Sequence, residues 1–324
     1  MPDNSSLGGM LRAASPARTA ADAKPDAAAL VARDRILNSG QPTHRRHRTV
    51  TIGWASGLAL ATASALIAAV LIVPQTTARA GAPLSSAALA PSVAEIVDEA
   101  QADLSMSSGP AAPQRFVRTA SWNFSVDAGT GELRVFTQLS TISWEPDGSG
   151  HVVLMNSPER DPADAEWYSH AEMPFSGDVE EFPMLPGEFV TPVMDPPAES
   201  LAGMQEALVA LEMPDDPSAF EVVTAVTTLL GQWTLTNAQH AALLRIIEDA
   251  GGAEAVPATH DRLGRAVDGL RVMSPDGAVS DVVLVSADTG RIVGVERTVV
   301  KADSLLPAGA ILGSQLWDVE GLVE

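Results

Sequence analysis

Histidine is the residue used most often for general acid–base catalysis and for binding zinc, and four histidines follow residue 48: His151, His170, His240 and His260. No two of them are four residues apart, and none belongs to a His-Glu-x-x-His motif, so their spacing does not predict a zinc hydrolase. The chain also lacks the Gly-x-Ser-x-Gly turn that presents a nucleophilic serine. We therefore expect no catalytic residue and no enzymatic activity.

Motifs for cofactors and metals are missing as well. Neither the phosphate-binding Gly-x-x-x-x-Gly-Lys-Ser/Thr pattern nor the dinucleotide-binding Gly-x-Gly-x-x-Gly pattern occurs. Since the chain has no cysteine, disulfides, thiolate metal sites and a cysteine nucleophile are excluded. Asp161, Asp164 and Glu166 do not follow the spacing of a calcium-binding loop, so we expect no metal and no cofactor.

One charged pair has a predicted structural role. Asp261 and Arg265 stand four residues apart and would pair to fix a corner between a helix and a strand. The neighbouring His260-Asp261 step is typical of a capped turn, which is the role we expect for it.

Residues 158–199 contain eight prolines and eleven acidic residues, with no sustained periodicity. A loop of this length is usually functional or disordered. Its aromatic side chains would either recognise a partner that is basic or tolerates proline, or attach the segment to a sheet as a long covering loop. These aromatic residues are Trp167, Tyr168, Phe175, Phe182 and Phe189.

An uncharged, apolar segment predicts that the chain crosses a membrane, and it predicts on which side the residues above would lie. Residues 49–78 carry no charge, and the central twenty, 54–73, are almost entirely apolar. At about 1.5 Å per residue, twenty residues match a hydrocarbon core of roughly 30 Å, so we expect one transmembrane helix over 49–78. Basic residues precede it, which predicts that the amino terminus lies inside the cell and the carboxy-terminal domain outside. A signal peptide cleaved near Ala78-Arg79-Ala80 is the alternative.

Small residues recur every four positions along this segment and would share one face of the helix. Such a face lets two helices approach closely, so it is a candidate seam for a homodimer, formed by Gly53, Gly57, Ala61, Ala65 and Ala69.

Charge changes at the same boundary. Residues 1–48 hold eight Lys/Arg and four Asp/Glu, which leaves 12 basic and 37 acidic residues in the rest of the chain, a balance of −25. An acidic domain repels nucleic acid and anionic lipid, so we exclude nucleic acid as a ligand and favour a cationic or basic partner.

Periodicity then predicts an α+β fold, an antiparallel sheet with helices packed on one face. A Ser92–Glu95 capping box starts a helix that runs to about residue 105. Strands follow at 114–126, 132–144 and 151–156, then three helices between 200 and 250, then strands at 266–273, 280–286, 291–300 and 311–319. The expected organisation is a short, largely disordered cytoplasmic arm (1–48), the span (49–78), a linker and helix (79–113) and an extracytoplasmic domain (114–324).

Several of these features together resemble an uncharacterised family of actinobacterial single-pass membrane proteins. The residues that carry the resemblance are Gly251-Gly252, Asp261-Arg262-Leu263-Gly264-Arg265 and Asp288-Thr289-Gly290-Arg291. Members are often encoded beside extracytoplasmic-function sigma factors and some are described as anti-sigma-like. The resemblance implies a location in the cell membrane and a cytoplasmic sigma factor as a partner, although the arm lacks the His/Cys pattern of zinc-binding anti-sigma domains.

From these observations we expect a membrane-anchored envelope sensor or interaction protein that meets an envelope protein or lipid outside. The alternative is an envelope lipid or lipoprotein carrier, in which a curved sheet backed by helices encloses an apolar cavity. A large pocket between the sheet and the helices would favour the carrier, and a packed interior would favour the sensor.

Overall fold

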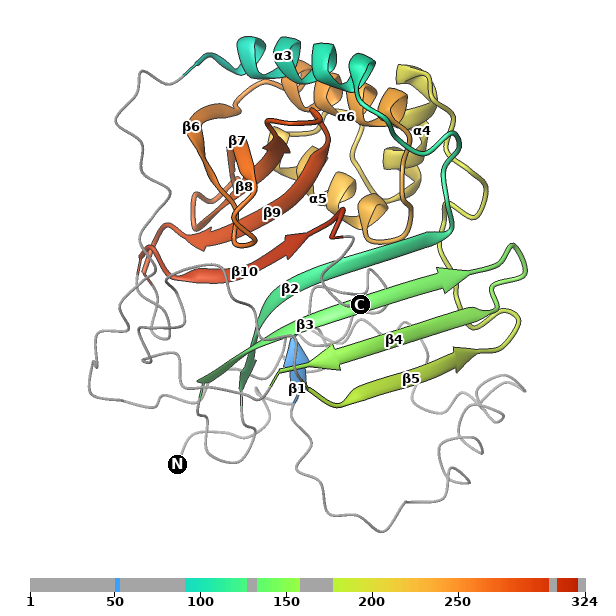
Figure 1. Ribbon diagram of the computed structural model, residues 1–324. Helices are drawn as coiled ribbons and strands as arrows, with labels where there is room; N and C mark the ends of the chain where they lie inside the picture. Colours follow the sequence, from blue (N-terminus) through green and yellow to red (C-terminus); the bar gives the residue numbers. More distant parts are fainter. Residues whose placement is uncertain (1–49, 53–90, 127–132, 158–176, 303–307, 320–324) are drawn as a thin grey trace, which may run out of the picture. The chain divides into compact units, whose positions relative to one another are not determined.

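The computed structural model describes residues 50–52, 91–126, 133–157, 177–302 and 308–319 (Figure 1). The chain divides into two units, Met1–Arg48 and Thr49–Glu324, and all described residues belong to the second. Residues 53–78 of the expected span lie outside the described ranges. Within those ranges, no helix has the length and apolar character needed to cross a membrane. Val50–Ile52, at the start of the expected span, are not helical but form strand β1.

The described strands form one antiparallel sheet in the order β5-β4-β3-β2-β10-β9-β8-β7-β6, and β1 pairs with β2 off this path. Two meanders, β2–β5 and β6–β10, are thus joined where the last strand pairs with β2 (Figure 1). The strands after β1 are β2 (Phe116–Val126), β3 (Leu133–Trp144), β4 (Gly150–Asn156), β5 (Val179–Met184), β6 (Glu254–His260), β7 (Ala266–Met273), β8 (Val279–Ser286), β9 (Ile292–Val299) and β10 (Ile311–Leu316).

Four helices are described, and local capping chemistry explains where they begin. They are α3 (Val93–Met106), α4 (Leu201–Ala210), α5 (Ala219–Leu230) and α6 (Asn237–Asp249). Ser92, Ser218 and Thr236 each accept from the backbone three residues on, and the Glu or Gln there bonds back to the cap, which completes a capping box. Gly251 and Gly252 follow α6 with φ of 68° and 75°, a backbone region that favours glycine and ends the helix.

The main core lies between the helices and the sheet. Apolar residues spaced three or four apart on α4, α5 and α6 face this core, whereas Leu201 at the start of α4 is exposed. α5 packs on β7 and β8, and α3 packs on α6 and β6 (Figure 1). The sheet contributes alternate residues from both meanders, among them Val117 of β2 and Leu270 of β7. The α+β class with an antiparallel sheet and helices is therefore confirmed.

The opposite face of the sheet carries a second apolar cluster. It includes Ala120, Leu139, Leu284 and Leu316, and Trp122 packs against it. Ala120 and Trp122 of β2 thus belong to this second cluster, whereas Val117, on the other face of the same strand, lies in the core beneath the helices.

Besides β1, two strands were not expected from the sequence. β5 lies inside the segment that we interpreted as a long loop, and β6 lies where we expected only a corner after a helix. Both are the outermost strands of the path, and each contains a proline, Pro183 or Pro257. Proline lacks a backbone donor and is tolerated mainly in edge strands, so neither segment shows an unbroken strand pattern.

Candidate functional site

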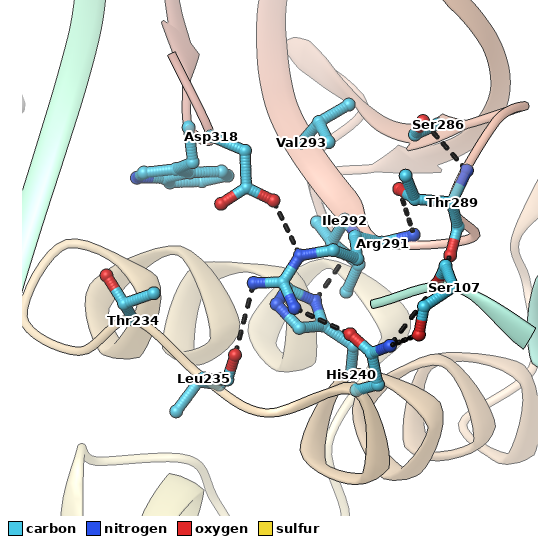
Figure 2. Close-up of polar contacts among 12 residues, drawn as sticks. Ser107, Thr234, Leu235, His240, Ser286, Thr289, Arg291, Ile292, Val293 and Asp318 are labelled. Carbon is cyan, nitrogen blue, oxygen red and sulfur yellow. Dashed lines mark hydrogen bonds and ion pairs between the residues drawn. The ribbon is translucent and has the colours of Figure 1, made fainter. Parts of the chain in front are cut away.

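A buried polar cluster that joins distant segments surrounds Arg291, which follows the β8–β9 turn (Figure 2). Its side chain is 7% exposed. Nε donates to Oδ2 of Asp318 at 2.6 Å, Nη1 donates to Oδ1 of Asn237 at 2.8 Å, and Nη2 donates to the Leu235 carbonyl at 3.1 Å. A buried guanidinium is stable only with such a set of partners. Here the partners lie just after β10 and at the start of α6.

Asn237 extends the cluster to α3. Its Nδ2 donates to the carbonyls of Leu104 and Ser107, at 2.9 and 3.0 Å. These carbonyls belong to the last turn of α3 and the residue that ends it, where intrahelical partners run out. The Ser107 hydroxyl in turn donates to the Thr289 carbonyl at 3.1 Å. Asn237 and Ser107 therefore fasten the end of α3 to α6 and to the β8–β9 turn (Figure 2).

Close backbone packing supports the same connection. Gly290 adopts φ of 71°, and a Cβ at this position would lie 2.0 Å from the carbonyl oxygen of Ala100 in α3. Only glycine fits both the left-handed backbone and the contact. The Asp288-Thr289-Gly290 turn, part of a motif that carries the family resemblance, thus contacts α3 directly.

His240 lies against the same residues and is fully buried. Its Nδ1 accepts a hydrogen bond from the Ile292 backbone N–H at 3.2 Å (Figure 2). Burial, and secondarily the positive charge of Arg291, hold the pKa of His240 well below its usual value. The imidazole is therefore neutral, and it serves as a structural acceptor without access to a substrate.

The predicted Asp261–Arg265 pair is confirmed and adjoins this cluster. Arg265 Nε donates to Asp261 Oδ2 at 2.7 Å, and Asp261 Oδ1 accepts from the backbone of Leu263 and Arg265. Arg265 also donates to the carbonyls of Trp317 and Asp318. The corner joins two strands, β6 and β7, and not a helix to a strand, because β6 lies before it.

These contacts form a structural junction, in which α3, α6, the β8–β9 turn and the end of β10 are joined by hydrogen-bonded polar groups. Arg291 and Asn237 donate to protein acceptors within it. Within the described ranges, no three His, Asp or Glu side chains are grouped so that they could hold a metal ion. The arrangement can position α3.

No match to the chain is found among protein family models, curated proteins or solved structures. Function must therefore be argued from the residues and their geometry.

Of the four histidines considered at the outset, the three that the structure describes are not brought together. His151 lies on β4, 3.6 Å from Glu181 of β5, with both side chains well exposed. His240 is on α6 and His260 at the end of β6, whereas His170 lies outside the described residues. Asp161, Asp164 and Glu166 also lie outside them.

The aromatic segment is described only from residue 177 onward, so Trp167, Tyr168 and Phe175 lie outside the structure's description. Phe182 is 45% exposed on the edge strand β5. Phe189 is buried and stacks on Trp144 with 4.7 Å between ring centroids. Phe189 therefore attaches the segment to the sheet, as one of our two interpretations required, whereas Phe182 is exposed at the edge of the sheet.

The Trp144–Phe189 stack belongs to a larger aromatic cluster that the sequence did not reveal. Trp233 meets Trp144 edge to face, with 4.9 Å between centroids, and the Arg115 guanidinium lies about 5 Å from both tryptophan rings. Both indole N–H groups donate to backbone carbonyls, of Gln232 and Val193. Both indoles are therefore satisfied in the core, and Arg115 Nη2 donates to the Met194 carbonyl, whereas Arg115 Nε is buried without a hydrogen-bond partner.

The structure also identifies site residues that sequence reasoning missed, chiefly Arg291 and Asn237. Their partners are 27 to 133 residues away, so no local spacing predicts them. Arg291 was noted only as part of a turn motif. All five residues of the candidate dimer seam, Gly53, Gly57, Ala61, Ala65 and Ala69, lie outside the described residues.

Proposed function

We propose that the protein is a membrane-anchored interaction or sensor protein, in which residues 49–78 span the membrane and the α+β domain faces the envelope. The uncharged length of this segment and the basic residues before it support the proposal. The domain supplies binding surface and position, and no enzymatic step is assigned to it.

The observation that favours a sensor or interaction protein over a lipid carrier is the close packing between the helices and the sheet. Leu229, Trp233, Leu243 and Ile247 are at most 1% exposed there. A carrier needs a cavity that buries most of an acyl chain, on the order of 300 Å³ or more. A hollow beside α5 holds about 10 Å³, which is room for a single water molecule.

The junction around Arg291 suggests how the anchor and the domain would be connected. α3 begins at Val93, fifteen residues after the expected span ends. Because α3 is fastened at its far end through Asn237 and Ser107, a change in the orientation of the span would reach the domain through a docked helix. The acidic surface favours a basic partner outside, and Phe182 on β5 is an exposed apolar contact for it.

On the cytoplasmic side we propose that residues 1–48 meet a protein partner, and the family resemblance names a sigma factor as the first candidate. The test is affinity capture of the full chain from gently solubilised native membranes, compared with a chain that lacks residues 1–43. Mass spectrometry then identifies bound proteins and lipids. A sigma factor lost on truncation supports the proposal, whereas co-purified lipid without any cytoplasmic protein supports the carrier.

Homodimerisation through the span is a further part of the proposal. Gly57→Ile places a branched side chain on the small-residue face and should weaken self-association in a membrane association assay. Ala59→Ile, which places the same side chain two residues further on and off that face, is the matched control. If both variants self-associate as strongly as the unsubstituted chain, the small-residue face is not a dimer seam.

A further inference from the structure

The sheet splits along one edge of β2. β10 pairs with β2 only through Ser314↔Trp122, Gln315↔Ser121 and Leu316↔Ala120. Beyond Ser314, β10 stays paired with β9 as far as Ile311, through a register shift between Ile311 and Gly313. Because β10 follows β9 there, it leaves β2 after Trp122.

The interior at the split is imperfectly filled. The hollow mentioned above lies between the strands that separate, with Trp122, Asn123 and Gly313 in its wall. Ser314, which also lines it, is 2% exposed, and its hydroxyl has no hydrogen-bond partner. β2 therefore has a stretch of edge, from Phe124 onward, that β10 does not cover.

The chain's own residues occupy this stretch. β1 pairs antiparallel with β2 through Val50↔Val126, Thr51↔Ser125 and Ile52↔Phe124. The other edge of β2 is paired with β3 along its whole length, so β1 must lie on the edge that β10 leaves. Val-Thr-Ile is a β-branched sequence that suits a strand.

This pairing conflicts with the proposed membrane topology. A helix that spans from about residue 54 to 73 with its amino terminus inside would keep residues 50–52 on the inner side of the membrane. β2 would lie on the outer side, beyond a hydrocarbon core of roughly 30 Å. Paired strands are only about 4.8 Å apart, so one molecule cannot satisfy both arrangements.

We propose that the open edge of β2 at residues 124–126 is a strand-addition site for the chain's own Val50–Ile52, and that this pairing and membrane insertion are alternative states of the protein. The inference rests on the proposed anchor. In the uninserted chain the site is closed by β1. In the inserted chain the same edge is exposed on the envelope side.

The absence of native cysteine makes the pairing directly measurable. Thr51 and Ser125 are Cα partners, and opposed residues of an antiparallel pair are about 4.5–5.5 Å apart, within the range of a disulfide. The full chain with Thr51→Cys and Ser125→Cys would be made by cell-free synthesis, either in mild detergent or with inner-membrane vesicles. Disulfide formation is then scored separately in the carbonate-resistant, inserted pool and in the uninserted pool.

Two further cysteine pairs serve as controls. Thr141→Cys with Val153→Cys joins Cα partners of β3 and β4, and it should cross-link in both pools wherever the domain is folded. Thr51→Cys with Thr119→Cys is six residues out of register on β2, roughly 20 Å away, and should not cross-link in either pool.

The expected result is a Thr51–Ser125 cross-link in the uninserted chain and its loss to the level of the out-of-register control in the inserted chain. Cross-linking in the inserted pool would overturn the exclusion, and none in the uninserted pool would overturn the strand-addition site. If no carbonate-resistant pool forms, the anchor itself fails, and the cross-link in the uninserted chain then reports on β1 alone.

Discussion

At the scale of single residues, the domain depends on a few buried polar groups that join distant segments. Arg291 lies where α6, the β8–β9 turn and the end of β10 meet, and it bonds to Asn237, Leu235 and Asp318. Replacing a whole buried ion pair by apolar side chains changes stability little. Removing only one partner lowers stability strongly, because the remaining partners stay buried without a hydrogen bond. Substitutions at Arg291 should therefore be far more costly than those of surface ion pairs.

Arg291→Met tests this expectation. The variant leaves Asp318, the Asn237 amide oxygen and the Leu235 carbonyl without their donors, so we expect a loss of about 3 kcal/mol in the free energy of unfolding. Urea titration followed by circular dichroism measures it. The matched control is Arg245→Met, which removes an exposed pair with Glu248 within α6 and should leave the urea midpoint unchanged. Equal midpoints for the two variants would contradict the role given to Arg291.

His240 makes stability depend on pH. Because its folded-state pKa lies well below the ordinary value of 6.5, the unfolded chain binds a proton that the folded chain does not, as pH falls below 6.5. The contribution of His240 is therefore complete above pH 6.5 and is lost toward acid, at about 1.4 kcal/mol per pH unit until the folded pKa is reached.

Unfolding of the full domain measured between pH 7 and 5 would check the sign. His240→Asn keeps an acceptor near the Ile292 N–H and removes the titration, so its stability should change less over this range. His260→Asn, on an exposed side chain, should retain the slope of the unsubstituted protein. A slope unaffected by His240→Asn would assign the pH dependence to other groups.

At the scale of elements, α3 is held by complementary backbone as well as by polar side chains. Gly290→Ala would introduce a Cβ that collides with the Ala100 carbonyl at a residue with positive φ, so we expect a loss of about 3 kcal/mol. Gly251→Ala shares the positive φ but has open space around it, and should cost about 1 kcal/mol.

Hydrogen exchange distinguishes a local from a general effect of Gly290→Ala. Amides of α3 should lose protection more than those of α5, because the collision lies at the α3 contact. Uniform loss across both helices would mean that α3 is not released separately from the core.

The segment after residue 177 combines one attached aromatic residue with one exposed aromatic residue. Phe189→Ala removes the ring that stacks on Trp144 and should cost about 3–4 kcal/mol. Phe182→Ala, on exposed β5, should change stability within about 0.5 kcal/mol and instead reduce capture of an outer partner. Thermal unfolding and affinity capture of both variants measure these effects. Loss of stability in Phe182→Ala would show that β5 is packed by other parts of the chain.

Local chemistry explains which elements were predictable. Capping boxes at Ser92 and Thr236 and the glycines after α6 set helix ends within a few residues, and such signals are read directly from sequence. β5 and β6 were missed because each is an edge strand interrupted by a proline, so its pattern resembles a loop. Of the junction, only the Asp261–Arg265 pair was predicted, since its partners are four residues apart. The Asn237 contacts with α3 depend on tertiary packing across more than 100 residues.

At the scale of the whole domain, β10 is the strand that makes one sheet from two meanders. It is last in sequence, yet it lies between β2 and β9. The strands β2–β5 are joined to the rest of the sheet only through β10, the last strand. We therefore expect the domain to fold as a single cooperative unit, with no independent stability in either half. β1 contributes three residues at the margin of this sheet, so a chain of residues 81–324 should retain that cooperativity.

Leu316→Ala tests the cooperativity at the strand that joins the meanders. Leu316 is fully buried, opposite Ala120 of β2 and Gly294 of β9, so truncation should cost about 2–5 kcal/mol. If the sheet is one unit, amides of β3 and β8 should lose protection together in native-state hydrogen exchange, and a single unfolding transition should shift. Val300→Ala, on an exposed side chain, is the control. Loss of protection confined to the β6–β9 strands would show that each meander is stable alone, and the split beside β10 would then be a boundary between two folding units.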